Sequence, residues 1–144
     1  MKKCHWLLLA VIIAAPTCAH FKKPVTIDYV VGEKARIDMA ENPALKEVIR
    51  KDLDSYRIRL EGLTVKNVTV SNNIDYDFCV IADVSTEKGM VECNIYSKDV
   101  KTVARLVKGE SKIDVTGMFG RFFSLLDDYY TRLEIVKASI RVVN

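Results

Sequence analysis

The fold of this 144-residue chain is decided by the stretch LVKGESKIDVTG, residues 106–117. A helical pattern ends at its start, and Gly109 supplies the turn that follows. Ile113, Val115 and Gly117 then alternate with polar residues, which is the period of a strand with one buried face. A helix that leads into such a strand is typical of the second half of a small Greek-key barrel.

Three strands are expected before this stretch and one after it. Period-two alternation begins at Tyr56 and is interrupted by Gly62, which indicates a bulge or a bend. Two further strands are expected at 76–84 and 90–96, joined by a short turn. The last strand is expected at 130–142, with an irregularity near Lys137. The first three of these strands are expected to form a meander with short connections.

Helices are expected at two places and a short strand at a third. Asn42 followed by Pro43 is a good helix start. Apolar residues then recur at helical spacing: Leu45, Val48, Ile49 and Leu53. We expect this amphipathic helix to extend to about Asp54 and to pack on a sheet. Residues 98–107 predict a second helix capped by Ser97, and the β-branched residues at 25–31 predict a short strand.

The order strand, strand, strand, helix, strand, strand predicts an all-β domain with accessory helices. Its architecture would be a five-stranded Greek-key OB-fold barrel preceded by an amphipathic helix. An up-and-down barrel or a split α+β sheet could produce a similar pattern.

The segments YRIRLEG (56–62), VECNI (91–95), LVKG (106–109) and IDVTG (113–117) resemble exported bacterial OB-fold proteins of the tRNA_anti-like family. The resemblance covers residues 43–142 and implies a short helix before the barrel. The exported, stress-associated BOF group of OB-fold proteins shares this plan and stays an alternative. Residues 20–41 have no identified counterpart. Because the resemblance rests on strand ends and glycines, it implies a fold and no catalytic residues.

The N-terminus has the pattern of a secretory signal. Lys2 and Lys3 precede an apolar run at 6–15, which Pro16 ends. The run is too short to cross a bilayer, which takes about 20 apolar residues. Cleavage after Ala19 would release a periplasmic protein, whereas lipidation of Cys18 would give a membrane-anchored lipoprotein. We therefore divide the chain into a signal peptide (1–19), an N-terminal segment (20–41) and a helix-plus-barrel domain (42–144).

Composition argues against a general affinity for nucleic acid. Hydrophobic residues make up 49% of the chain, the usual globular share. Without Lys2 and Lys3 the 22 basic residues become 20, against 19 acidic ones. A nearly neutral chain exerts no long-range attraction on a polyanion.

Two cysteines, Cys79 and Cys93, fall on adjacent predicted strands. In an oxidising compartment they are disulfide candidates, if the hairpin register places them opposite each other. The other interpretation is two buried thiols that act as small hydrophobic residues. Two cysteines and His20 do not supply four zinc ligands, so we predict no metal site.

The binding face of an OB-fold lies on strands two and three, between the first–second and fourth–fifth loops. This chain would place six candidate ligand-binding residues there: Tyr76, Phe78, Tyr96, Arg121, Phe122 and Phe123. Binding of single-stranded nucleic acid needs aromatic platforms in a positive groove. Acidic residues crowd the same strands and turns: Asp75, Asp77, Asp83, Glu87 and Glu92. The aromatic residues could equally be part of the core.

The predicted fourth–fifth loop, residues 120–128, is unusually apolar. It either folds over the barrel mouth and closes the core, or exposes Phe122 and its neighbours as a patch for a partner.

Catalytic patterns are missing from the sequence. No histidine follows His20, and there is no glycine-rich phosphate loop and no Gly-x-Ser-x-Gly motif. We expect no enzyme and no cofactor. The sequence predicts a non-catalytic binding module of the bacterial cell envelope, which recognises a protein, a glycan or a small ligand. The alternative is a single-stranded nucleic-acid-binding OB-fold protein.

Overall fold

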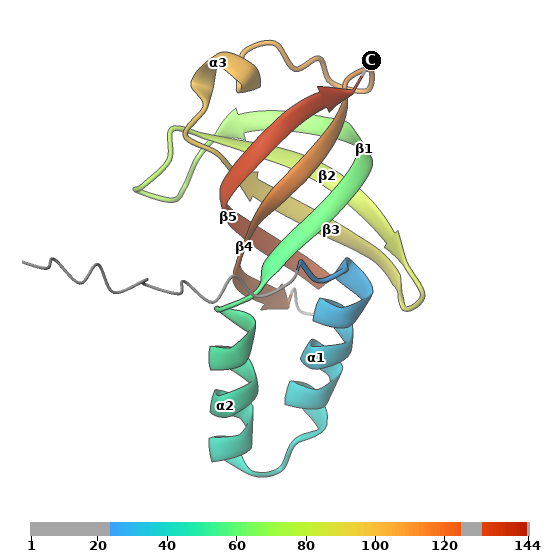
Figure 1. Ribbon diagram of the computed structural model, residues 1–144, viewed down its shortest axis with the longest axis vertical. Coiled ribbons are helices and arrows are strands. Elements are labelled where there is room, and N and C mark those ends of the chain that lie inside the picture. Colours follow the sequence, from blue (N-terminus) through green and yellow to red (C-terminus); the bar gives the residue numbers. More distant parts are fainter. Residues whose placement is uncertain (1–23, 125–130, 144) are drawn as a thin grey trace, which may run out of the picture.

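The computed structural model describes residues 24–124 and 131–143, which form a barrel with a pair of helices below it (Figure 1). The elements in chain order are α1 (Ile27–Met39), α2 (Pro43–Leu53), β1 (Arg57–Val70), β2 (Phe78–Thr86), β3 (Gly89–Tyr96), α3 (Val100–Val103), β4 (Lys112–Ser124) and β5 (Thr131–Val143). The strands close in the order β1-β2-β3-β5-β4. The predicted OB-fold barrel with accessory helices is therefore confirmed. None of the helices in the described part of the chain is long and apolar enough to span a membrane.

The long strand β1 joins both sides of the barrel. Its first half pairs with β4 and its second half with β2. The register shifts between Leu60 and Leu63, where Gly62 has φ +65°. Glycine adopts this left-handed conformation without a steric cost. The bend that the sequence predicts at Gly62 is confirmed.

Strand β5 pairs in parallel with β3 and antiparallel with β4. Its register with β4 shifts between Thr116 and Met118, and Lys137 has φ +51° on the opposing strand. A β-bulge at this point increases the local bend, as closure of a small barrel requires. The predicted irregularity near Lys137 is confirmed.

The core fills the barrel interior with branched apolar side chains. Eight aliphatic residues among them are fully buried: Ile58, Val65, Val80, Ile95, Ile113, Val115, Leu133 and Ile135. Burial of each contributes about 1.5–3 kcal/mol. Gly117 lies against this core so closely that a Cβ there would be 2.4 Å from Ile135 Cγ2. The glycine that ends the quoted sequence stretch is thus required by packing.

The strand predicted at 25–31 is wrong, because α1 begins at Ile27. The Thr26 side chain accepts a hydrogen bond from the Tyr29 backbone N–H (3.4 Å) and caps the helix. Ile27, Val30 and Val31 are buried on one helical face. Only Val25 keeps a β contact, as its N–H donates to the Arg57 carbonyl (2.7 Å). Tertiary burial of the helical face outweighs the β propensity of these residues.

Helix α2 begins at Pro43 behind the Asn42 cap, as predicted. It packs beside α1 and not on a sheet, so that part of the expectation is wrong (Figure 1). Ile49 and Leu53 are buried, whereas Leu45 is 46% exposed and Val48 is 56% exposed. One neighbouring helix covers only half of the apolar stripe.

Helix α3 is much shorter than the predicted 98–107. It has four residues, and its cap is Asp99, not Ser97. The chain leaves the helix at Ala104 and turns at Gly109, whose N–H donates to the Val65 carbonyl (2.8 Å). Pairing of this turn with β1 replaces the last helical turns that periodicity alone predicts.

Candidate functional site

The register of β2, β3 and β5 decides which side chains face away from the core. Alternate residues of β2 and β3 are buried inside the barrel, and the residues between them point outward. Pairing then aligns Glu92 with Arg132 and Asn94 with Glu134. We call this surface the outer face, and it includes the end of β4: Cys79, Ile81, Asp83, Glu92, Asn94, Tyr96, Arg121, Phe123, Arg132 and Glu134.

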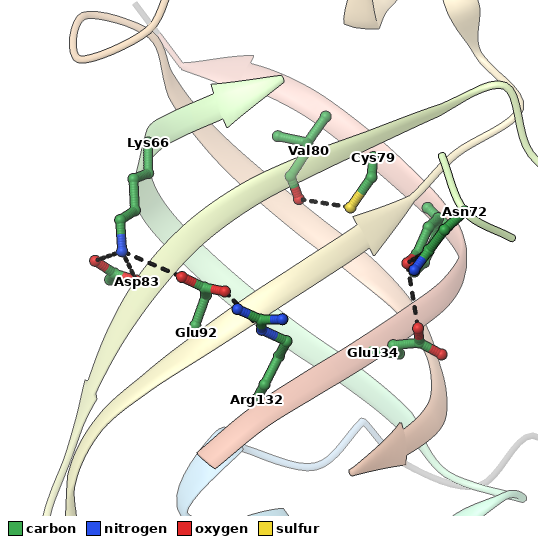
Figure 2. Close-up of polar contacts among 9 residues, drawn as sticks. Lys66, Asn72, Cys79, Val80, Asp83, Glu92, Arg132 and Glu134 are labelled. Carbon is green, nitrogen blue, oxygen red and sulfur yellow. Dashed lines mark hydrogen bonds and ion pairs between the residues drawn. The ribbon is translucent and has the colours of Figure 1, made fainter. Parts of the chain in front are cut away.

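A row of alternating charges crosses the outer face (Figure 2). Lys66 Nζ lies 3.0 Å from Asp83 Oδ2 and 3.2 Å from Glu92 Oε2. Arg132 Nε lies 2.7 Å from Glu92 Oε1, as an ion pair without hydrogen-bond geometry. Hydrogen bonds to the two carboxylates raise the pKa of Lys66. Two of the acidic residues that the sequence places on this face, Asp83 and Glu92, are therefore neutralised by neighbouring cations.

A second polar cluster surrounds Glu134, which is only 3% exposed. Its carboxylate accepts hydrogen bonds from Arg121 Nε (2.8 Å) and Nη2 (3.3 Å). The Tyr96 hydroxyl lies 3.2 Å from Glu134 Oε1 and 2.9 Å from Asn72 Oδ1, and with a single proton it donates to one of them at a time. Burial, followed by the charges of Cys79 and Glu134, raises the pKa of Tyr96. The cluster links β3, β4, β5 and the β1–β2 loop.

The β1–β2 loop, residues 71–77, is fixed against one end of the outer face. The Tyr76 ring lies 5.5 Å from the Tyr96 ring, centroid to centroid. The Tyr76 hydroxyl accepts a hydrogen bond from the Lys137 backbone N–H (2.9 Å). Ile74 at the loop tip is fully exposed. The loop is therefore held by its aromatic residue, while Ile74 at its tip faces solvent.

Four of the six predicted ligand-binding residues come together outside the barrel. Tyr76 lies beside Tyr96, which shares the Glu134 carboxylate with Arg121. The Arg121 guanidinium in turn lies over the Phe123 ring, 4.3 Å from its centroid. Phe78 and Phe122 do not join them, because both are packed against the core. Phe122 is paired with Leu133, and its ring lies 4.8 Å from that of Phe119. Strand alternation sends these two rings inward.

The expected start of the loop 120–128 is wrong. Gly120 to Ser124 continue β4, because they pair with β5 up to Thr131. Phe122 helps to close the core, which agrees with one of the two interpretations of this segment. Residues 125–128 lie outside the described residues.

Of the two interpretations of Cys79 and Cys93, the disulfide is wrong and the pair of buried thiols is confirmed. Cys79 pairs with Tyr96, and Cys93 pairs with Ala82. This register differs by an odd number of residues from the one that would join the cysteines, so they lie on opposite faces of the sheet. Both are free and buried. Burial raises the pKa of Cys79 to about 11 and that of Cys93 to about 12.

Sequence reasoning did not single out Glu134, Arg132, Asn94 or Lys66. A signal was present, because Glu134 is the charged residue between Leu133 and Ile135 in an apolar strand. Its burial depends on Arg121 and Tyr96, which only the barrel brings near. No cluster of potential metal ligands occurs within residues 24–124 and 131–143. Comparisons with protein-family models and with curated proteins found no match for this chain.

Proposed function

We propose that this chain is a non-catalytic binding module that recognises a glycan, or a small polar ligand, through the outer face. OB-folds bind oligonucleotides and oligosaccharides on this face. The charge row favours the oligosaccharide here, because Lys66 and Arg132 already pair with Asp83 and Glu92 and neither cation is free for a phosphate backbone. Neutral, hydroxyl-rich ligands are compatible with such a face, where the exposed Arg121 guanidinium lies beside the Phe123 ring.

Rigidity supports the same proposal. The Glu134 carboxylate holds Arg121 and Tyr96 in one arrangement, and the loop that carries Tyr76 is bonded to β5. A binding site whose side chains are already ordered loses less entropy when the ligand binds. Asn94 Oδ1, in the middle of this arrangement, is buried without a hydrogen-bond partner among the described residues. A rotation of the amide would offer that oxygen to a ligand hydroxyl.

The two cysteine thiols support a non-catalytic role, because neither is activated as a nucleophile. A cysteine nucleophile reacts as the thiolate and requires a lowered pKa. The pKa of Cys79 is raised to about 11 and that of Cys93 to about 12. Both are protonated at neutral pH.

Export to the bacterial envelope is part of the proposal and rests on the N-terminal sequence. Residues 1–23, including the lipidation candidate Cys18, lie outside the described residues. The envelope would supply glycans as ligands. Intact mass of the protein recovered from its host separates cleavage after Ala19 from lipidation at Cys18.

The function is tested by NMR titration of the chain, as the cell produces it, with neutral oligosaccharides of glucose, mannose and N-acetylglucosamine. We expect saturable shifts at the amides of Asn94, Tyr96 and Arg132. Arg132→Gln should weaken binding, while Arg50→Gln on α2 serves as the control for loss of one surface charge. An oligothymidylate at low and moderate salt forms the second arm.

Two outcomes would contradict the proposal. If no oligosaccharide shifts the amide signals of the outer face, the proposal that this face binds a glycan is wrong. Binding of oligothymidylate that weakens steeply with salt would favour the alternative, a single-stranded nucleic-acid-binding protein.

A further inference from the structure

A cleft of about 330 Å³ opens at the Tyr76 end of the outer face. It lies between the loop residue Tyr76, the segment 97–99 that follows β3, and the β5 bulge at 137–139. We propose that this cleft binds one anionic group, a carboxylate or a phosphate, carried by a sugar ring. The inference rests on the proposed function and specifies the ligand of the same surface.

The charges around the cleft sum to one positive unit. Lys98 and Lys137 line it, and neither has an ion-pair partner in the part of the chain that the structure describes. Asp99 also lines it, and hydrogen bonds from Thr102 lower the pKa of its carboxylate, which is therefore ionised at neutral pH. Two cations and one anion leave a balance that suits a single anionic group.

The unpaired lysines here differ from the cations elsewhere on the outer face. Lys66, Arg121 and Arg132 each contact a carboxylate. The two aspartates of the neighbouring loop, Asp75 and Asp77, are not among the described residues that line the cleft. The cleft is thus the place on this surface where positive charge is available to a ligand.

The Lys98 ammonium lies over an aromatic ring. Its Nζ is 5.8 Å from the centroid of the partly exposed Tyr76 ring. Sugar rings pack on aromatic side chains through their apolar face, while their charged substituent needs a cation nearby. Tyr76 provides the aromatic ring and Lys98 the cation, and the two lie close together in the cleft. The exposed Ser139 adds a hydroxyl at the cleft margin.

The backbone of Lys137 is consistent with a role for its side chain. Its φ of +51° is a conformation that glycine adopts without strain and lysine does not. Its N–H donates to the Tyr76 hydroxyl, so the bulge and the loop are joined at the cleft. Strained residues of this kind cluster at functional sites, because the surrounding structure holds them in place.

The test uses four probes on the chain as the cell produces it: glucose, glucose 6-phosphate, glucuronate and inorganic phosphate. Amide shifts of Lys98 and Ser139 report binding in low-salt buffer. We expect at least one of the two charged sugars to bind about tenfold more tightly than glucose and more tightly than phosphate alone. The two charged sugars separate a phosphate from a carboxylate requirement.

Variants then locate the effect. Lys98→Gln with Lys137→Asn should reduce binding of the charged sugar to the level of glucose, and asparagine tolerates the left-handed backbone at 137. Lys101→Gln on α3 removes one exposed lysine outside the cleft and should leave binding unchanged. If the double variant does not fold, Lys98→Gln alone should still weaken binding of the charged sugar.

The inference is overturned if charged sugars and glucose bind equally, or if Lys101→Gln weakens binding as much as Lys98→Gln. The first result would show that the cleft does not recognise an anionic group. The second would show that charged sugars are attracted by surface charge in general and not by a specific site. In both cases retained binding of neutral oligosaccharides leaves the proposed function standing. If instead a charged sugar binds in the cleft while no oligosaccharide shifts the outer face, the proposed function fails and the cleft site remains.

Discussion

Glu134 and Arg121 form a two-point ion pair on the outside of the barrel, with Nε–Oε2 at 2.8 Å and Nη2–Oε1 at 3.3 Å. The Glu134 side chain is 3% exposed, whereas that of Arg121 is 59% exposed. The buried member of the pair is therefore the acid. The hydrogen bond from Arg121 to this carboxylate raises the pKa of the guanidinium.

Arg121→Ala should destabilise the protein by about 2 kcal/mol, because the buried Glu134 loses its charged partner. The loss of a fully buried pair would cost more, but the exposed side of Arg121 is screened by water. Adding Glu134→Gln to Arg121→Ala should recover about 1 kcal/mol, since a neutral amide is easier to bury. Urea unfolding of the wild type, both single variants and the double variant measures this coupling. If the free-energy changes of the two single variants add up to that of the double variant, the ion pair does not contribute to stability.

Gly117→Ala should destabilise the barrel by about 2–4 kcal/mol, because its Cβ would be 2.4 Å from Ile135 Cγ2. Gly32 in α1 is the matched control, since a Cβ there meets nothing within 4 Å. Gly32→Ala should stabilise the protein by about 0.5–1 kcal/mol through its helix propensity. Thermal unfolding monitored by circular dichroism compares the two. Equal effects of the two alanines would contradict the close approach at Gly117.

Lys137→Gly should stabilise the fold by about 0.5–1 kcal/mol, since it relieves a left-handed backbone at φ +51°. The same variant should weaken binding of a charged sugar in the cleft. Urea unfolding and the NMR titration are measured on the same preparation. A stabilised variant with unchanged binding would leave Lys137 out of the site, and a destabilised variant would show that the lysine side chain supports the bulge.

Stability should fall in alkaline solution between about pH 9 and pH 12. In the unfolded chain Cys93 loses its proton above its ordinary pKa of 9.0, whereas the native thiol, with a pKa of about 12, keeps it. The unfolded state therefore binds fewer protons in this range. The free energy of unfolding therefore falls by up to about 1.4 kcal/mol per pH unit for each such thiol.

Cys93→Ala should reduce that slope, although the lost side chain lowers stability at every pH. Urea unfolding at pH 8, 9.5 and 10.5 tests this. A slope that is identical in the variant and the wild type would mean that other groups, such as Tyr96, cause the alkaline loss. Native protein at pH 8 should also react slowly with a thiol reagent at both Cys79 and Cys93, and quickly once unfolded.

The strands and their irregularities are the part of the fold that local sequence predicts well. Alternation locates β1 to β5, and Gly62 marks the bend of β1. These features depend on neighbours a few residues apart in the chain. The helix at Ile27–Met39 was not predicted, because its β-branched start favours a strand until the barrel end and α2 bury one helical face.

The candidate site was predicted in part. Tyr76, Tyr96, Arg121 and Phe123 are on the outside of the barrel, while Phe78 and Phe122 point into it. Residue type alone does not decide between the two sides of a strand. A shift of one position in register exchanges the two sides, and no local pattern sets the absolute register.

The sequence by itself determined the order of the five barrel strands, the glycine bend in β1 and the irregularity near Lys137, because these follow from side-chain periodicity and backbone preference. Only the tertiary structure decided that Cys79 and Cys93 lie on opposite faces, that Glu134 is buried under Arg121, and that Lys98 and Lys137 share a cleft. Those relationships join residues far apart in the chain. Their distances are set by strand register and barrel closure, which are properties of the whole packed molecule.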